Sequence, residues 1–348
     1  MAGSERALRD HLNAGQVIPA HPLALTRDRA LDVTHQRALT RYYVDAGVGG
    51  IAVGVHTTQF AIRSHGLYEP VLALAAETAR ESRAAAASPF VLVAGVIGVT
   101  KSAVAEARVA ASLGYDMALL GLGALRDADE ATLIAHCRAV AEVLPLFGFY
   151  LQPAVGGRVL SYSFWREFAE IERAWAIKIA PFNRYQTLDV VRAVVDAGRE
   201  DLALYTGNDD NIIVDLLTPF PAGRAAHVRR MAGGLLGQWA VWTQAAVRML
   251  DRVRAARSGS LDARWLRENA ALTDANGAIF DAAHAFAGCI PGIHEVLRRQ
   301  GLLRGTWCLD PGEVLSPGQA HEIDRVIARY PELVDDAFVQ ENLSRWLR

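Results

Sequence analysis

The chain has 348 residues, of which 51% are hydrophobic and 21% are charged, and its formal net charge at pH 7 is −2. This composition predicts a large core, either for one α/β domain with an appendage or for two domains, and excludes general disorder. The near-neutral charge, with no concentrated basic run, gives no electrostatic support for binding to nucleic acid or to an anionic membrane.

The cysteines and the lengths of the apolar runs indicate in which cellular compartment the protein is expected. The three cysteines, Cys137, Cys289 and Cys308, are widely spaced and form neither a disulfide framework nor a pair of metal ligands. Residues 1–12 are polar and lack the apolar core of a signal peptide. No stretch approaches 18 uninterrupted apolar residues, so no membrane span is predicted. We therefore expect a cytoplasmic protein that uses no metal or cofactor.

From residue 16 to about residue 250, short β-rich runs alternate with longer alanine-rich helical segments. Several helical segments end at a glycine, the expected stop signal. Strands alternating with helices imply right-handed βαβ units and a parallel sheet. Eight strands in this span predict an α/β fold, a (β/α)8 TIM barrel over residues 1–250. The strands are expected at residues 17–20, 50–55, 90–94, 117–120, 146–150, 175–179, 202–205 and 231–236.

A doubly wound open sheet is the alternative architecture. It would usually carry a Gly-x-Gly-x-x-Gly loop after its first strand, and no such loop follows Ala20. After residue 250 the strand patterns cease, and residues 251–348 are expected to form a helical extension. Helices are predicted there at residues 252–257, 262–276, 278–288, 293–299 and 319–330.

Lysine usage is the sharpest chemical signal. Only Lys101 and Lys178 occur, whereas the other 34 basic residues counted with them are arginines. Lys178 lies in the apolar, strand-length run of residues 175–180. Arginine cannot replace an amine that must lose its proton and attack a carbonyl, and burial lowers a lysine pKa toward that function. The alternative is a structural lysine whose ammonium reaches solvent at the end of the strand.

Other reactive side chains follow neighbouring strands. In a barrel, the residues at the carboxyl ends of the strands converge on one site. Tyr150 ends the fifth predicted strand, and His56, Thr57 and Thr58 follow the second. The seventh strand ends in the segment Tyr-Thr-Gly-Asn-Asp-Asp at residues 205–210. An amine, a phenol, hydroxyls and an imidazole are therefore expected at the same end of the barrel.

Five segments, in order and spacing, resemble the dihydrodipicolinate synthase and N-acetylneuraminate lyase family over about residues 15–250. Ala-Ile-Lys-Ile-Ala at residues 176–180 is similar to the family's Gly-Ile-Lys-Glu-Ala/Ser, and Tyr-Leu-Gln-Pro at 150–153 is similar to Tyr-Asn-Val-Pro. Residues 47–51, 94–96 and 204–209 resemble its Gly-Val-Asp-Gly-Ile, Ala-Gly-Val and Tyr-Ser-Gly-Asp-Asp segments.

The resemblance implies a Schiff-base lyase or aldolase, or a dehydratase, that acts on a 2-keto acid such as pyruvate. Lys178 would form the Schiff base, Tyr150 would transfer protons, and Thr57 would bind the substrate carboxylate. It also implies a homo-oligomer, either a dimer or a tetramer. The further substrate-binding candidates are Thr58, His56, Gly207, Asn208 and Arg158. His56 is either a proton relay or a packed loop residue.

Two departures from the family pattern bear on the activity. The family's tyrosine after the fourth strand is replaced by the segment at residues 122–125, and the arginine expected two residues after Pro153 is Val155. Arg158 could reach in from the loop instead. We therefore expect an aldolase, lyase or dehydratase other than the lysine-biosynthetic synthase. A catalytically degenerate barrel that binds a keto acid or serves assembly is the alternative, and a metal-assisted lyase using Asp209 and Asp210 is a third hypothesis.

Overall fold

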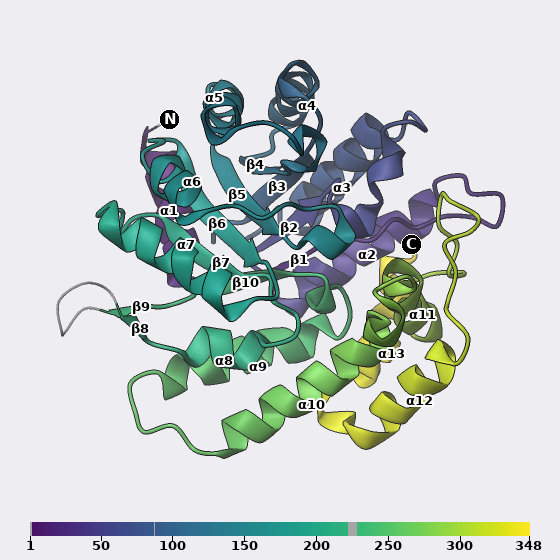
Figure 1. Cartoon of the computed structure of the whole chain (residues 1–348). Coiled ribbons are helices and arrows are strands. Elements are labelled where there is room, and N and C mark those ends of the chain that lie inside the picture. Colours follow the sequence, from purple (N-terminus) through teal and green to yellow (C-terminus); the bar gives the residue numbers. More distant parts are fainter. Residues whose placement is uncertain (1, 87, 222–227) are drawn as a thin grey trace. The chain divides into compact units, whose positions relative to one another are not determined.

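The computed structural model describes residues 2–86, 88–221 and 228–348 (Figure 1). Eight strands form a sheet in the order β1-β10-β7-β6-β5-β4-β3-β2. A parallel bridge between Ala20 and Ala52 joins the two ends of this order, so the sheet closes. The predicted α/β fold, a (β/α)8 TIM barrel, is confirmed. The strands are β1 Val17–Pro19, β2 Gly50–Val53, β3 Val91–Val96, β4 Met117–Leu120, β5 Leu146–Leu151, β6 Ala174–Ala180, β7 Ala203–Thr206 and β10 Gly233–Leu236.

Helices alternate with these strands, as the sequence pattern predicts. Helix α1 (Ala2–Ala14) precedes β1, and the short strands β8 (Phe220–Pro221) and β9 (Val228–Arg229) pair antiparallel before β10. No helix among the described residues combines the length and apolar character needed to cross a membrane. The alternating helices are α2 Val33–Ala46, α3 Tyr68–Ser82, α4 Thr100–Ser112, α5 Glu130–Ala141, α6 Tyr162–Phe168, α7 Arg184–Asp196, α8 Ile212–Leu217 and α9 Thr243–Ala256.

The C-terminal part is helical, as predicted, with one predicted helix wrong and one observed helix missed. The expected helix over residues 278–288 is wrong. Asp281, Ala285 and Phe286 have φ angles of 58°, 52° and 68°, and an L-residue in this left-handed region cannot continue a right-handed helix. The helices observed are α10 Arg264–Ile279, α11 Cys289–Arg299, α12 Gln319–Arg329 and α13 Asp336–Trp346, of which α13 was not predicted.

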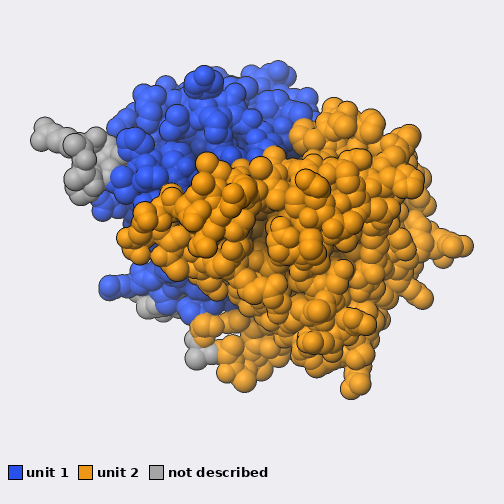
Figure 2. Space-filling model, turned by 90° about the horizontal axis from the view of Figure 1, so that it is seen from below, with its two compact units in different colours: residues 1–16, 89–235 blue, residues 17–88, 236–348 orange. Residues whose placement is uncertain are grey.

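The described chain divides into two compact units (Figure 2). Unit 1 comprises Met1–Gln16 and Pro89–Leu235, and unit 2 comprises Val17–Ser88 and Leu236–Arg348. This division cuts through the strand order, whereas the boundary predicted at residue 250 separates the chain by the type of element. The predicted domain boundary stays a prediction.

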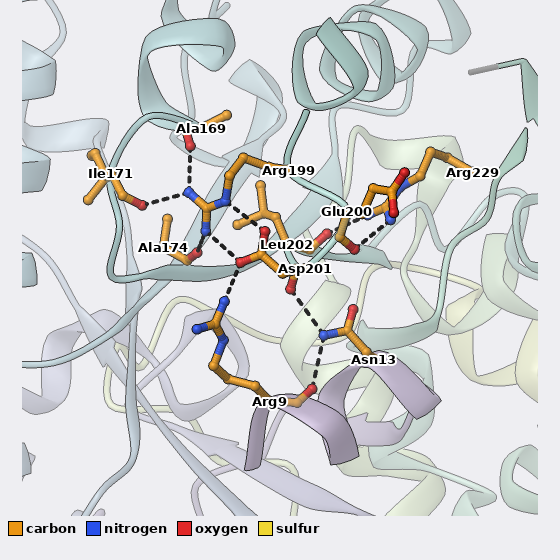
Figure 3. A network of polar contacts seen from close by, with 10 residues as sticks. All are labelled: Arg9, Asn13, Ala169, Ile171, Ala174, Arg199, Glu200, Asp201, Leu202 and Arg229. Atoms are coloured by element: carbon orange, nitrogen blue, oxygen red, sulfur yellow. Dashed lines mark hydrogen bonds and ion pairs between the residues drawn. The ribbon is translucent and has the colours of Figure 1, made fainter. Parts of the chain in front are cut away.

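A partly exposed polar network anchors helix α1 within unit 1 (Figure 3). Asp201 accepts hydrogen bonds from Arg199 and forms an ion pair with Arg9 of α1. The backbone carbonyl of Asp201 also accepts a hydrogen bond from Asn13 at 3.0 Å. The Arg199 guanidinium donates further hydrogen bonds at 2.6–3.1 Å to three backbone carbonyls between α6 and β6. These carbonyls belong to Ala169, Ile171 and Ala174.

We expect Arg199→Ala to lower the free energy of unfolding by about 2–3 kcal/mol, because it leaves several acceptors unpaired beneath the sheet. Arg192→Ala is the matched control: its side chain on α7 is 61% exposed, pairs with Asp189 along the helix and lies over the Tyr162 ring at the surface, which predicts a loss of about 1 kcal/mol or less. Urea denaturation measures both values. Equal losses in the two variants would contradict the anchoring role of Arg199.

Candidate active site

Strand β6 places Lys178 deep in unit 1. The residue is only 9% exposed. Its Cα pairs with Phe149 of β5 on one side and with Tyr205 of β7 on the other. The Lys178 Nζ lies 4.6 Å from the centroid of the Phe149 ring, a cation–π distance. The amine therefore occupies an apolar, aromatic environment near the carboxyl end of a barrel strand, where TIM barrels carry their reactive groups.

Burial changes the protonation of this amine. Loss of hydration lowers the pKa of Lys178 to about 8, and the nearby carboxylate of Asp209 acts in the opposite direction by stabilising the ammonium. With this pKa, on the order of a tenth of the amine is neutral at pH 7. An amine poised in this way can attack a carbonyl carbon, which arginine cannot do.

Gly207 packs directly against the lysine side chain. A Cβ atom at this position would lie 2.7 Å from Lys178 Cε and 2.7 Å from Ala180 Cβ. Such contacts are shorter than real Cβ atoms make, so a larger residue would displace the lysine. The structure thus brings together two predicted site residues, Lys178 and Gly207, with Gly207 serving as the wall beside the amine.

Tyr150 does not lie beside the amine, and our expectation of that placement is wrong. Its hydroxyl donates to the Leu160 carbonyl and accepts from the Leu160 N–H, both at 3.1 Å. Its ring packs on Trp165 of helix α6, with ring centroids 5.5 Å apart. Gly148, two residues earlier, faces the same helix. Tyr150 therefore points to the helix-covered face of the sheet, and Phe149 points to the face of Lys178.

A register shift between β5 and β6 explains why Phe149, and not Tyr150, lies on the same face as Lys178. Leu146 pairs with Ala174, but the next residue, Phe147, pairs with Ala176, so Trp175 has no partner in β5. An unshifted register would place Tyr150 opposite Lys178. The extra residue moves the pairing by one, and one residue changes the face of every side chain that follows.

Asn208 and Arg158 make contacts within the protein. Asn208 is fully buried, and its amide oxygen accepts from the Phe182 N–H at 2.9 Å while its amide nitrogen donates to Asp215 at 2.9 Å. Arg158 donates to the carbonyls of Leu125 and Ala128 and so ties together the loops that follow β4 and β5. Both residues hold loops in place in this structure, and their predicted contact with substrate stays a prediction.

The threonine pair lies in unit 2, at the carboxyl end of β2. The Thr57 hydroxyl donates to the Ala20 carbonyl at 2.8 Å, and the Thr58 hydroxyl donates to the His21 carbonyl at 2.6 Å. Both side chains are buried and fasten the end of β2 to the end of β1. The neighbouring His56 contacts Phe60, with ring centroids 5.8 Å apart. The hydroxyl protons are thus engaged by backbone carbonyls, and substrate binding by these three residues stays a prediction.

The sequence reasoning missed the importance of Phe149 and Asp209. Phe149 provides the aromatic face beside the amine, and only the register of β5 reveals this. Asp209 was considered solely as a metal ligand, although it directly follows the Gly-Asn pair after β7 and acts electrostatically on Lys178. Among the described residues, no group of three or more His, Cys, Asp or Glu side chains could hold a metal ion.

Comparison with known sequences gives a family match. Residues 13–233 match the family described as the Dihydrodipicolinate synthetase family. The 4-hydroxy-tetrahydrodipicolinate synthase of Exiguobacterium sp. is 30% identical over 179 residues, which are 51% of this chain and 57% of that protein. The enzyme of the same name from Acaryochloris marina is 31% identical over 159 residues, 45% of this chain and 51% of that protein. The match thus spans just over half the length of these relatives.

Solved structures share the fold. The dihydrodipicolinate synthase of Aquifex aeolicus superposes with a TM-score of 0.73 at 18% identity, covering 92% of this chain and 99% of that one. The N-acetylneuraminate lyase of Fusobacterium nucleatum gives a TM-score of 0.71 at 17% identity, covering 91% and 99%. The Acinetobacter baumannii dihydrodipicolinate synthase, solved in complex with pyruvate, gives 0.71 at 18% identity, covering 92% and 99%.

The lowered pKa predicts an unusual pH dependence for the reactivity of Lys178. The neutral fraction of an amine rises with pH, so modification of Lys178 by a small acylating reagent should reach half its plateau near pH 8. Peptide mass spectrometry measures it, with the exposed Lys101 as reference in the same sample. A midpoint above pH 10 for Lys178 would contradict the buried, apolar setting of the amine.

The opposite faces of β5 predict different effects for substitutions at Phe149 and Tyr150. Phe149→Ala should admit water beside the amine and raise the midpoint of Lys178 modification by about one pH unit. Tyr150→Phe should leave this midpoint unchanged and lower the free energy of unfolding by about 1–2 kcal/mol, because the Leu160 backbone groups lose a partner. Modification kinetics and urea denaturation test both. A shifted midpoint in Tyr150→Phe but not in Phe149→Ala would indicate that Tyr150, and not Phe149, lies beside the amine.

Proposed function

The chain belongs to the dihydrodipicolinate synthetase family, and on this premise we propose that it is a Schiff-base-forming lyase of the aldolase or dehydratase type. Its substrate would be a 2-keto acid of the pyruvate type, and its nucleophile the amine of Lys178. The observation that carries the proposal is the burial of this amine between Phe149 and Gly207, which lowers its pKa to about 8.

The chemistry follows from the amine. Neutral Nζ of Lys178 adds to the ketone carbon of the substrate, and loss of water from the adduct leaves an iminium whose nitrogen carries the positive charge. This iminium withdraws the electron pair of a bond at the adjacent carbon. Cleavage or formation of a carbon–carbon bond, or loss of water, then becomes accessible, so the amine alone defines the reaction class but not its direction.

Phe149, the aromatic residue beside the amine, cannot itself transfer a proton. A phenylalanine ring beside the amine stabilises a cation through its face, which suits the iminium, but it carries no proton to donate. Tyr205, the phenol closest to Lys178 in the strand register, donates its proton to the Leu12 carbonyl at 2.8 Å. Asp209 is the carboxylate that acts on Lys178, and we assign proton transfer to it.

The same phenylalanine favours a second candidate function. A barrel without a phenol beside the lysine could hold a keto acid, reversibly and without turnover, as a ligand-binding or assembly protein. This candidate predicts heat of binding for pyruvate in calorimetry. It also predicts that no carbon–carbon bond is made or broken when the bound keto acid is offered a panel of aldehydes.

Further expectations accompany the proposal. Contact of Thr57 with the substrate carboxylate and of Thr58 and His56 with the substrate stays a prediction, as do a cytoplasmic location and assembly into a dimer or tetramer. Light scattering of the purified chain at several concentrations measures the assembly state. A measured mass equal to that of one chain at every concentration would contradict the expected dimer or tetramer.

Borohydride trapping tests the function directly. Incubation with pyruvate and other 2-keto acids, followed by borohydride, should reduce the iminium to a stable secondary amine on the peptide that contains Lys178. Mass mapping locates the adduct. The exposed Lys101 serves as the internal control because its amine lacks the enclosed environment. Adducts on neither lysine, or equally on both, with every keto acid of the panel would sink the proposed mechanism.

A further inference from the structure

A fully buried carboxylate lies behind the candidate site. Asp215 of α8 has no exposed surface. One of its oxygens accepts from Arg184 at the start of α7 and from Asn211, and the other accepts from Thr206 at 2.7 Å and Asn208 at 2.9 Å. Burying an ionised carboxylate is costly unless such donors compensate it. Four donors therefore meet at a single side chain, one from the start of α7 and three from residues 206–211.

Asn208 extends this network to the end of the lysine strand. Its amide oxygen accepts the N–H of Phe182 at 2.9 Å. Phe182 lies two residues after the end of β6 and has a φ of 53°. This left-handed conformation is unfavourable for phenylalanine and persists only when its surroundings fix it. Asp215, through Asn208, therefore holds the turn four residues beyond Lys178.

The network also holds the wall beside the amine. Gly207 lies between Thr206 and Asn208, two of the four residues whose side chains donate to Asp215. The packing of Gly207 on Lys178 Cε, described above, leaves no room for even one extra carbon atom. Asp209, which acts electrostatically on the amine, is the next residue. The position of segment 206–209 relative to Lys178 is thus set by hydrogen bonds to a carboxylate on its other side.

We propose that Asp215 is a positioning residue for Lys178: it contacts neither the amine nor the substrate, but its hydrogen bonds to Thr206 and Asn208 fix the Gly207 wall and the turn after β6. This inference rests on the proposed function for its catalytic meaning. A merely structural carboxylate would stabilise the fold and leave the chemistry of the amine unchanged, so the two roles differ in a measurable way.

The substitution Asp215→Asn tests the positioning role of Asp215 with a side chain of nearly the same shape. The substituted amide presents a donor where Thr206 and Asn208 also donate, so the wall should loosen and admit water beside the amine. We expect the midpoint of Lys178 acylation to rise by about one pH unit, which is an approximately tenfold lower rate at pH 7.5. The rate of borohydride trapping with pyruvate should fall by a similar factor. Lys101, read in the same digest, should not change.

Thr206→Val is the milder second variant, because it removes one donor and leaves the carboxylate paired with three. It should shift the midpoint in the same direction by a smaller amount. Asp189→Asn is the matched control for the charge, since Asp189 lies on α7 and pairs with Arg192 at the surface. Thr218→Val is the control for the hydroxyl, which bonds to the Val214 carbonyl at the end of α8. Neither control should move the midpoint.

The outcomes separate this inference from the proposed function. Unchanged midpoints and trapping rates in a folded Thr206→Val variant overturn the positioning role, even if Asp215→Asn fails to fold. A shifted midpoint in a protein whose wild type traps no keto acid supports the positioning of the amine and contradicts the proposed function. Normal trapping by the wild type, with no shift in either variant, leaves the function standing and overturns the role of Asp215.

Discussion

The structure of the candidate site depends on one constraint: an amine is buried where its charged form is poorly hydrated. Lys178 lies in a strand that is otherwise apolar, with an aromatic ring on one side and a glycine on the other. Burial of the ammonium costs stability at neutral pH, because the unfolded chain holds the proton more tightly than the native chain does. The same burial lowers the pKa of the amine and so raises its neutral fraction at neutral pH. A protein that needed only stability would place an aliphatic residue here.

Polar networks in unit 1 surround this apolar strand at both ends. Before β6 and β7, Arg199 and Asp201 satisfy backbone carbonyls and hold helix α1. After these strands, Asp215 accepts a hydrogen bond from Asn208, and Asn208 accepts one from the N–H of Phe182. These bonds hold the strained turn after β6 and the segment that contains Gly207. Each network is built on a buried or half-buried charge that is fully hydrogen-bonded, which is the condition under which such groups specify geometry rather than weaken the fold. The rigid surroundings give the flexible lysine side chain a defined direction.

Phe149 distinguishes this chain chemically from the pattern that its family resemblance implies. A phenol next to a Schiff base can give and take protons, whereas a phenyl ring only stabilises positive charge. A lysine without a neighbouring phenol could capture a carbonyl compound covalently and still lack the proton transfer that turnover of that compound requires. In the proposed function, the carboxylate of Asp209 is the group that would connect capture with turnover.

The sequence determined the architecture and singled out Lys178 as the candidate nucleophile. Strand-length apolar runs separated by helices that stop at glycine are local patterns, and all eight strands lie where these patterns predict them. The isolated Lys178 in an arginine-rich chain is likewise visible without coordinates. Helix α13 and the break near Asp281 escaped prediction because their conformations depend on packing and on left-handed backbone angles rather than on periodicity.

Only the tertiary structure decided which groups face the amine. The motif around Pro153 points to Tyr150, but the register of β5 is set against β6, where Trp175 is an extra residue without a partner. Side chains alternate between the two faces of a strand, so this single residue exchanged Tyr150 for Phe149. Asp215 escaped notice for a similar reason: its donors Arg184, Thr206, Asn208 and Asn211 follow no helix or strand periodicity, and only the folded loop after β7 brings them to one carboxylate.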